Sequence, residues 1–188
     1  MEESKNMLRK NMIDVKKMVK ISLLIALAFL LTYVRMPLFF LPFFPQYLKL
    51  DIAELPALIA GFLYGPVSGV LVVFVRNVLD ALAKTDTGGI GELSNFIVGS
   101  SFVLTASIIY KLDKSKKGAF RGVVFGTLVM AAIAVFSNKY VILPLYGIPA
   151  EWKFVFSFIL PFNLLKGTVN SIVVFLIYKK ISILLKSI

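Results

Sequence analysis

Long apolar stretches alternate with short polar segments along most of the chain. A helix needs about 20 residues to cross a hydrocarbon layer roughly 30 Å thick, and most of these stretches approach that length. The pattern predicts an all-α membrane protein, a six-transmembrane-helix bundle formed by a single domain over residues 1–188. The expected helices cover residues 19–34, 52–64, 67–83, 90–110, 120–143 and 152–183.

Two segments of this pattern differ from a simple span. Residues 1–18 alternate charged and apolar side chains, which is typical of a basic helix lying at a membrane surface. Residues 52–64 would form only about 20 Å of helix, which is short for a full span. We expect either that flanking residues extend this segment to both membrane surfaces or that it does not reach both of them.

The basic residues predict an orientation. Most of the 21 Lys and Arg residues lie in residues 1–20, in residues 111–121 and in the C-terminal tail. These segments fall on one side of a six-span bundle, and basic residues in short loops stay preferentially in the cytoplasm. Both termini are therefore expected to be cytoplasmic. Because the charge lies beside apolar spans, topology explains the net charge of +11 better than nucleic-acid binding does.

Composition excludes several kinds of chemistry. The sequence has no Cys and no His, which excludes disulfides, thiol nucleophiles, imidazole acid–base catalysis and the common zinc sites. It also has neither a recognisable nucleophile–base pair nor the glycine-rich phosphate loop of an ATPase. We therefore expect a transport protein without catalytic residues, with any ATP hydrolysis in a partner.

Polar side chains inside membrane helices are costly, so they mark candidate sites. Asn163, Lys166 and Asn170 follow i, i+3, i+7 spacing and share one helical stripe, where we favour ligand contact over a structural pair. Arg76 and Asp80 lie at i, i+4, and an internal ion pair or ligand contact explains them equally well.

Other features each have two interpretations. Asn138 lies near the outer end of its helix and either contacts a ligand or forms an interhelical hydrogen bond. The loop at residues 37–47 is rich in proline and aromatic residues, and it either covers a planar ligand or forms an interfacial aromatic belt. The small residues Ser22 and Ala26 either pack internally or contact a partner subunit.

Several segments, taken in order, resemble a known family. They are LKLDIAELPAL (48–58), GFLYGP (61–66), GELSNF (91–96), NKYVILPLY (138–146) and PFNLLKG (161–167). The first two resemble the second helix of the substrate-binding S components of energy-coupling factor (ECF) transporters. The other three resemble the riboflavin-specific branch of that family.

The resemblance implies a function and a set of site residues. It implies a riboflavin-binding subunit of a multi-pass prokaryotic plasma-membrane importer, with riboflavin as bound substrate and no resident cofactor. The implied partners are a transmembrane coupling protein, which would dock at Ser22 and Ala26, and two cytoplasmic ATPases. The implied riboflavin contacts are Glu54, Asn138, Asn163 and Lys166, with Asp80 and Asn95 as further contributors and Leu50 and Phe43 covering the ring.

Two rival functions stay open at this point. One is an S component for another vitamin. The other is an ion-coupled secondary transporter that would use Glu54, Asp80 and Lys166, although no internal repeat is visible to support it.

Overall fold

The structure, a computed structural model, describes residues 2–34, 36–37, 48–83, 85 and 87–186. Within them the fold is almost wholly helical, with one short antiparallel pair formed by β1 (Met36–Pro37) and β2 (Lys49–Leu50). The long helices are α1 (Glu2–Thr32), α3 (Pro66–Ala83), α4 (Ile90–Leu112), α5 (Lys116–Ser137) and α8 (Leu160–Lys186). The shorter elements are α2 (Glu54–Tyr64), η1 (Asn138–Ile142), α6 (Leu143–Leu145), α7 (Trp152–Phe154) and η2 (Val155–Ile159).

Four helical segments are long and apolar enough to cross a membrane. They are Pro66–Ala83, Ile90–Leu112, Lys116–Leu145 and Trp152–Ile177. α2 is apolar but has only 11 residues, so it extends over roughly 16 Å, in line with the short second helix expected from the sequence. These findings support a helical membrane protein, while the count of six spans stays a prediction.

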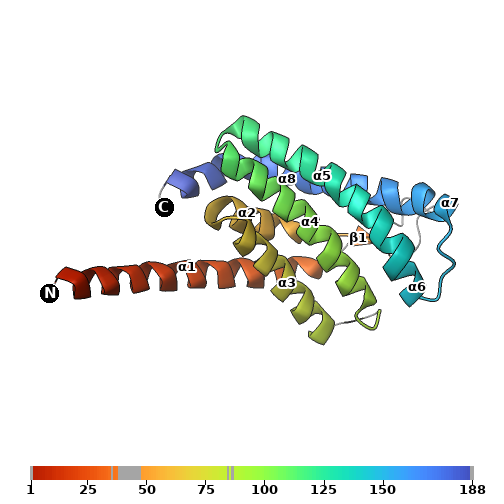
Figure 1. Cartoon of the computed structure of the whole chain (residues 1–188), viewed down its shortest axis with the longest axis horizontal. Coiled ribbons are helices and arrows are strands. Elements are labelled where there is room, and N and C mark those ends of the chain that lie inside the picture. Colours follow the sequence, from red (N-terminus) through yellow and green to blue (C-terminus); the bar gives the residue numbers. More distant parts are fainter. Residues whose placement is uncertain (1, 35, 38–47, 84, 86, 187–188) are drawn as a thin grey trace.

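The N-terminal segment differs from its predicted form. Residues expected to form a surface helix and a separate first span belong to one continuous helix, α1, which projects beyond the bundle (Figure 1). The sequence explains the continuity, because no proline or glycine occurs between Glu2 and Thr32 to interrupt the backbone hydrogen bonds.

Close helix packing forms the centre of the bundle. α4 and α5 lie against each other along most of their length, and α8 packs against α5 (Figure 1). A Cβ atom on Gly122 would lie 2.7 Å from the Ala106 carbonyl oxygen, so only glycine allows α5 to approach α4 so closely there. Buried side chains such as Phe102, Leu58 and Val72 complete the core beside this contact.

The two ends of the bundle differ in charge. The N-terminus, the α4–α5 turn and the C-terminus all lie at one end, whereas α6 and α7 lie at the other (Figure 1). The three segments that carry most Lys and Arg therefore share one end, as the sequence predicts. The opposite end holds a polar pocket.

Candidate functional site

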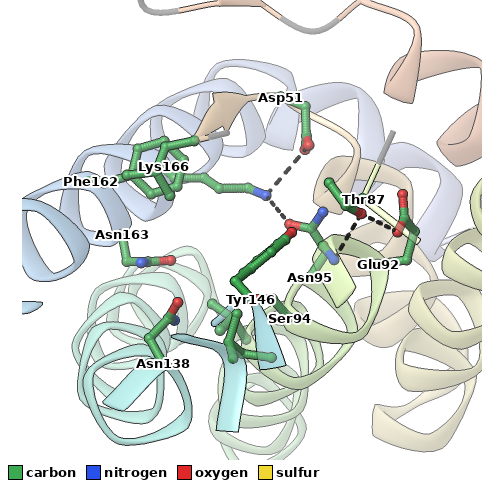
Figure 2. A pocket seen from close by; sticks show the side chains of 14 residues that line it. Asp51, Thr87, Glu92, Ser94, Asn95, Asn138, Tyr146, Phe162, Asn163 and Lys166 are labelled. Atoms are coloured by element: carbon green, nitrogen blue, oxygen red, sulfur yellow. Dashed lines mark hydrogen bonds and ion pairs between the residues drawn. The ribbon is translucent and has the colours of Figure 1, made fainter. Parts of the chain in front are cut away.

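A polar pocket opens between the start of α4, the η1–α6 segment, the start of α8 and the chain just before α2 (Figure 2). Fourteen residues line it. Figure 2 labels ten of them, all with polar or charged side chains except Phe162. The lining residues are Leu48, Asp51, Thr87, Gly91, Glu92, Ser94, Asn95, Val98, Asn138, Ile142, Tyr146, Phe162, Asn163 and Lys166.

Two buried amides, Asn138 and Asn163, lie on the same side of the pocket (Figure 2). Each side chain donates one hydrogen bond to a carbonyl of its own helix, over 2.9 Å to Ala134 and 2.8 Å to Ile159. An asparagine amide has a second N–H and a carbonyl oxygen, so each group is oriented yet keeps a donor and an acceptor for a ligand.

Two π-helical turns place these amides. η1 starts at Asn138, and η2 ends four residues before Asn163. In each turn the last bond spans five residues, from the Leu143 and Leu160 backbone N–H groups, and a proline follows at once. Proline has no N–H and crowds the preceding turn, which explains why regular α-helix gives way to a wider turn at both positions.

A buried cluster of charges fixes Lys166. Its ammonium nitrogen lies 3.2 Å from Asn95 Oδ1, 3.3 Å from Glu54 Oε1 and 3.5 Å from Asp51 Oδ2. Arg76 completes the cluster, with its guanidinium 3.4 Å from Glu54 and 3.9 Å from Asp51. Two carboxylates thus face two cations, and the arrangement holds the Lys166 ammonium at the wall of the pocket.

Asn170 ties the chain before α2 to this cluster. Its Nδ2 donates over 3.0 Å to the backbone carbonyl of Asp51 and over the same distance to that of Lys166. The Asp51 side chain in turn accepts from the Ala53 backbone N–H over 3.2 Å. The segment leading into α2 is therefore anchored to α8 at the edge of the pocket.

A second polar group borders the pocket at the start of α4. Thr87 donates to Glu92 over 2.9 Å and accepts from the Gly91 N–H over 3.0 Å, while Thr85 donates to Glu92 over 3.3 Å. Tyr146 lies next to them in the lining, and burial raises the pKa of its phenol, which keeps it a neutral hydrogen-bond donor. The oxygens of Glu92 and Thr87 can accept hydrogen bonds on this side of the pocket.

The structure brings together four of the residues expected from the sequence. Asn95, Asn138, Asn163 and Lys166 line one pocket although they come from three different helical segments. Glu54 is 1% exposed and is not among the described lining residues, but it pairs with the lining residue Lys166 over 3.3 Å.

The other expected residues lie elsewhere. Leu50 belongs to β2, and its neighbour Leu48 lines the pocket. Asp80 accepts from Thr32 of α1 over 3.4 Å and is not among the described lining residues. Phe43 lies outside the described residues, together with most of the loop expected to cover the ligand. Ser22 and Ala26 are exposed on α1.

Arg76 and Asp80 had two interpretations from their spacing. The ion pairs that the structure gives Arg76 lead to Asp51 and Glu54 rather than outward to a ligand. Arg76 is 1% exposed, which fits a structural role for this side chain.

Sequence reasoning did not single out Thr87, Glu92, Tyr146 or Phe162 as ligand contacts. Thr87 and Tyr146 lie in turns between helices. Hydrophobic periodicity does not predict in which direction a side chain points in a turn. The usable signal was the polar and aromatic content of the segments 91–96, 138–146 and 161–167, which together supply ten of the fourteen lining residues.

Comparison with known proteins gives consistent results. Residues 16–178 match the family model described as "ECF transporter, substrate-specific component". The riboflavin transporter RibU of Staphylococcus aureus (strain TCH60) is 40% identical over 186 residues, which cover 95% of this chain and 96% of that protein. The riboflavin transporter FmnP of Bacillus subtilis (strain 168) is 35% identical over 178 residues, covering 89% and 92% of the two chains.

A solved structure is also similar. It is described as the S component of a bacterial ECF transporter, is 40% identical in sequence and superposes with a TM-score of 0.82. The match covers 92% of this chain and 99% of that one. The likeness therefore extends over almost the whole helical bundle.

Proposed function

Because this chain belongs to the substrate-specific components of ECF transporters, we propose that it is the riboflavin-binding subunit of a vitamin importer. The observation that carries the proposal is the set of oriented amides and the fixed ammonium in one pocket, Asn138, Asn163 and Lys166. The relatives named as riboflavin transporters support the choice of vitamin.

The pocket matches the polar edge of the flavin ring. That edge alternates carbonyl acceptors with ring nitrogens, one of which carries a hydrogen. The free donor and acceptor of Asn138 and Asn163 suit such an alternating edge, and Lys166 supplies a charged donor to a ring oxygen or nitrogen. Phe162 and Ile142 line the same pocket and provide apolar contacts for the ring faces.

The ribityl chain needs acceptors for its hydroxyl groups. Glu92 and Thr87 lie on the opposite side of the pocket from the two amides (Figure 2), and Ser94 of α4 also lines the pocket. We assign these groups to the ribityl end. Glu54, which the resemblance implied as a riboflavin contact, is assigned instead to positioning Lys166 from below the pocket wall.

We further propose six spans with both termini in the cytoplasm and the pocket at the outer surface. The shared basic end of the bundle supports this orientation. The family implies a transmembrane coupling protein and two cytoplasmic ATPases as partners, and the exposed Ser22 and Ala26 of α1 are the proposed docking residues for the coupling protein.

Ion coupling is the less favoured alternative. A proton- or sodium-coupled carrier needs a carboxylate that is released from its partners during the cycle. In this structure the carboxylates of Asp51 and Glu54 are both paired with Arg76 and Lys166, which leaves them as structural charges.

Riboflavin titration of the purified, detergent-solubilised protein tests the proposal. We expect saturable quenching of flavin emission with a stoichiometry of about one flavin per chain, because one pocket holds the matching groups. Isothermal titration calorimetry with thiamine or biotin, neither of which emits as a flavin does, serves as the control for other vitamins. Saturation by one of these instead of riboflavin would keep the S-component assignment and overturn the substrate.

A further inference from the structure

A second depression lies between α5 and α8, away from the polar pocket. Its walls are mainly the apolar side chains Phe120, Val124 and Leu128 of α5 and Ile172, Phe175 and Leu176 of α8, all of them exposed. Both helices belong to segments long and apolar enough to cross a membrane, so this α5–α8 groove faces the hydrocarbon.

The two hydroxyl groups at the floor of the α5–α8 groove already donate hydrogen bonds within the protein. The Thr127 hydroxyl donates to the Val123 carbonyl over 2.8 Å, and the Ser171 hydroxyl donates to the Gly167 carbonyl over 2.7 Å. The two hydroxyls also lie 3.3 Å from each other. An apolar chain can therefore cover them without leaving a hydroxyl unpaired.

One end of the groove is basic. Lys116 Nζ lies 4.9 Å from the centre of the Phe175 ring, so this ammonium sits over a groove wall. Lys116 precedes Phe120 by four residues and Lys117 precedes Val124 by seven, which places both lysines on the groove face of α5. Both are exposed. Lys179 and Lys180 follow the last groove residue of α8 in the sequence.

Acidic groups do not cancel this charge. Asp113 is the only acidic residue in segment 111–121, and it pairs with Arg121 over 3.7 Å. Lys116 and Lys117 are left to face the mouth of the groove. A negative group held there would meet two ammonium groups close to the membrane surface, where such attraction is strong.

We propose that the α5–α8 groove binds an anionic phospholipid. One acyl chain lies along the apolar walls, and the phosphate headgroup meets Lys116 and Lys117. Lysines near helix ends ordinarily extend to the membrane interface. Here two of them lie at the end of an apolar groove that runs along α5 and α8, as an acyl chain would. A zwitterionic lipid would fill the same walls but carries no net charge for the lysines. The proposal does not depend on which vitamin the polar pocket takes.

Native mass spectrometry of the delipidated full-length protein tests this site. The protein receives equal amounts of phosphatidylglycerol and phosphatidylcholine with identical acyl chains, and we expect phosphatidylglycerol to be retained preferentially. The double variant Lys116→Gln/Lys117→Gln should lose roughly tenfold or more of phosphatidylglycerol retention, since each basic residue near an anionic headgroup contributes about fivefold. Retention of phosphatidylcholine should stay unchanged.

The matched control is Lys111→Gln/Lys114→Gln. It removes the same charge from exposed positions at the end of α4 and in the loop before α5, outside the α5 face that carries Lys116 and Lys117. We expect less than a twofold effect. A third variant, Thr168→Trp, places a bulky side chain in the groove from an exposed position and should lower retention of both lipids.

Three results would overturn the proposal. They are equal retention of the two lipids by the unaltered protein, an equal loss in the control pair, and unchanged phosphatidylglycerol retention in Thr168→Trp. The second result would indicate a diffuse charge effect. The third would place the lipid outside the groove.

Discussion

Lys166 illustrates how one side chain is both structural and functional. Its ammonium lies within 3.5 Å of Asp51, Glu54 and Asn95, and only 2% of the residue is exposed. Removing one partner from a buried ion pair strands the remaining charge in a medium that solvates it poorly. The same contacts that hold the lysine for a ligand therefore also stabilise the bundle.

We predict that Lys166→Met lowers the free energy of unfolding by roughly 3–5 kcal/mol and abolishes riboflavin binding, because two carboxylates then share one cation. Denaturant unfolding in detergent measures the first effect and flavin titration the second. The control is Lys153→Met, an exposed lysine on α7.

Adding Glu54→Gln separates the two roles of Lys166. The double variant restores charge balance in the cluster, so stability should recover in part while riboflavin binding stays lost. A Lys166→Met protein as stable as the Lys153→Met control would contradict the buried-cluster account.

At the residue scale, sequence spacing predicted the site in part. Asn163 and Lys166 share a stripe and both line the pocket, while their contact with a ligand stays a prediction. Asn170 lies on the same stripe, yet its amide binds the Asp51 backbone carbonyl instead of facing the pocket. Helical periodicity shows which residues share a face of a helix, but not which part of the protein packs against that face. Here the chain just before α2 packs against the part of the α8 face that carries Asn170.

At the scale of elements, the apolar pattern predicted the long helical segments after α1 within a few residues but missed the π turns. η1 and η2 each add a residue to a helical turn. The extra residue changes the side of the helix on which the neighbouring side chains lie. Pro144 and Pro161 were visible in the sequence, and each follows directly after the closing bond of a π turn. Whether a proline ends, kinks or widens a helix depends on tertiary packing, which spacing does not encode.

The continuity of α1 is a second difference at this scale. Composition divides residues 1–18 from the following apolar run, and this suggested two elements. The helix continues through this boundary because the residues on both sides of it favour helix. What changes there is whether the side chains are polar or apolar.

At the scale of the whole molecule, the distribution of Lys and Arg predicted which segments share an end of the bundle, and the fold agrees (Figure 1). The pocket could not be placed in this way. Its walls come from four segments separated by long stretches of chain, and only the packed bundle brings Asp51, Glu92, Asn138 and Lys166 together.

We predict that the basic end faces the cytoplasm. The chain has no native cysteine, so single cysteines at Ser115 and Glu151 provide unambiguous labels for the two ends of the bundle. In intact cells, a membrane-impermeant maleimide should modify Glu151→Cys and leave Ser115→Cys unmodified until the cells are opened. The reverse pattern would invert the orientation and place the pocket inside.

The most direct test of the central claim is a riboflavin titration of three asparagine variants. Asn138→Ala and Asn163→Ala remove the amides from the pocket, whereas Asn77→Ala removes a buried amide that also donates to its own helix, over 2.8 Å, but lies outside the pocket. We predict that each pocket variant weakens riboflavin binding by roughly 5- to 100-fold, as expected for a lost buried hydrogen bond, and that Asn77→Ala changes it by less than about twofold. Unchanged affinity in both pocket variants, or an equal loss in all three, would contradict the assignment of this pocket to riboflavin.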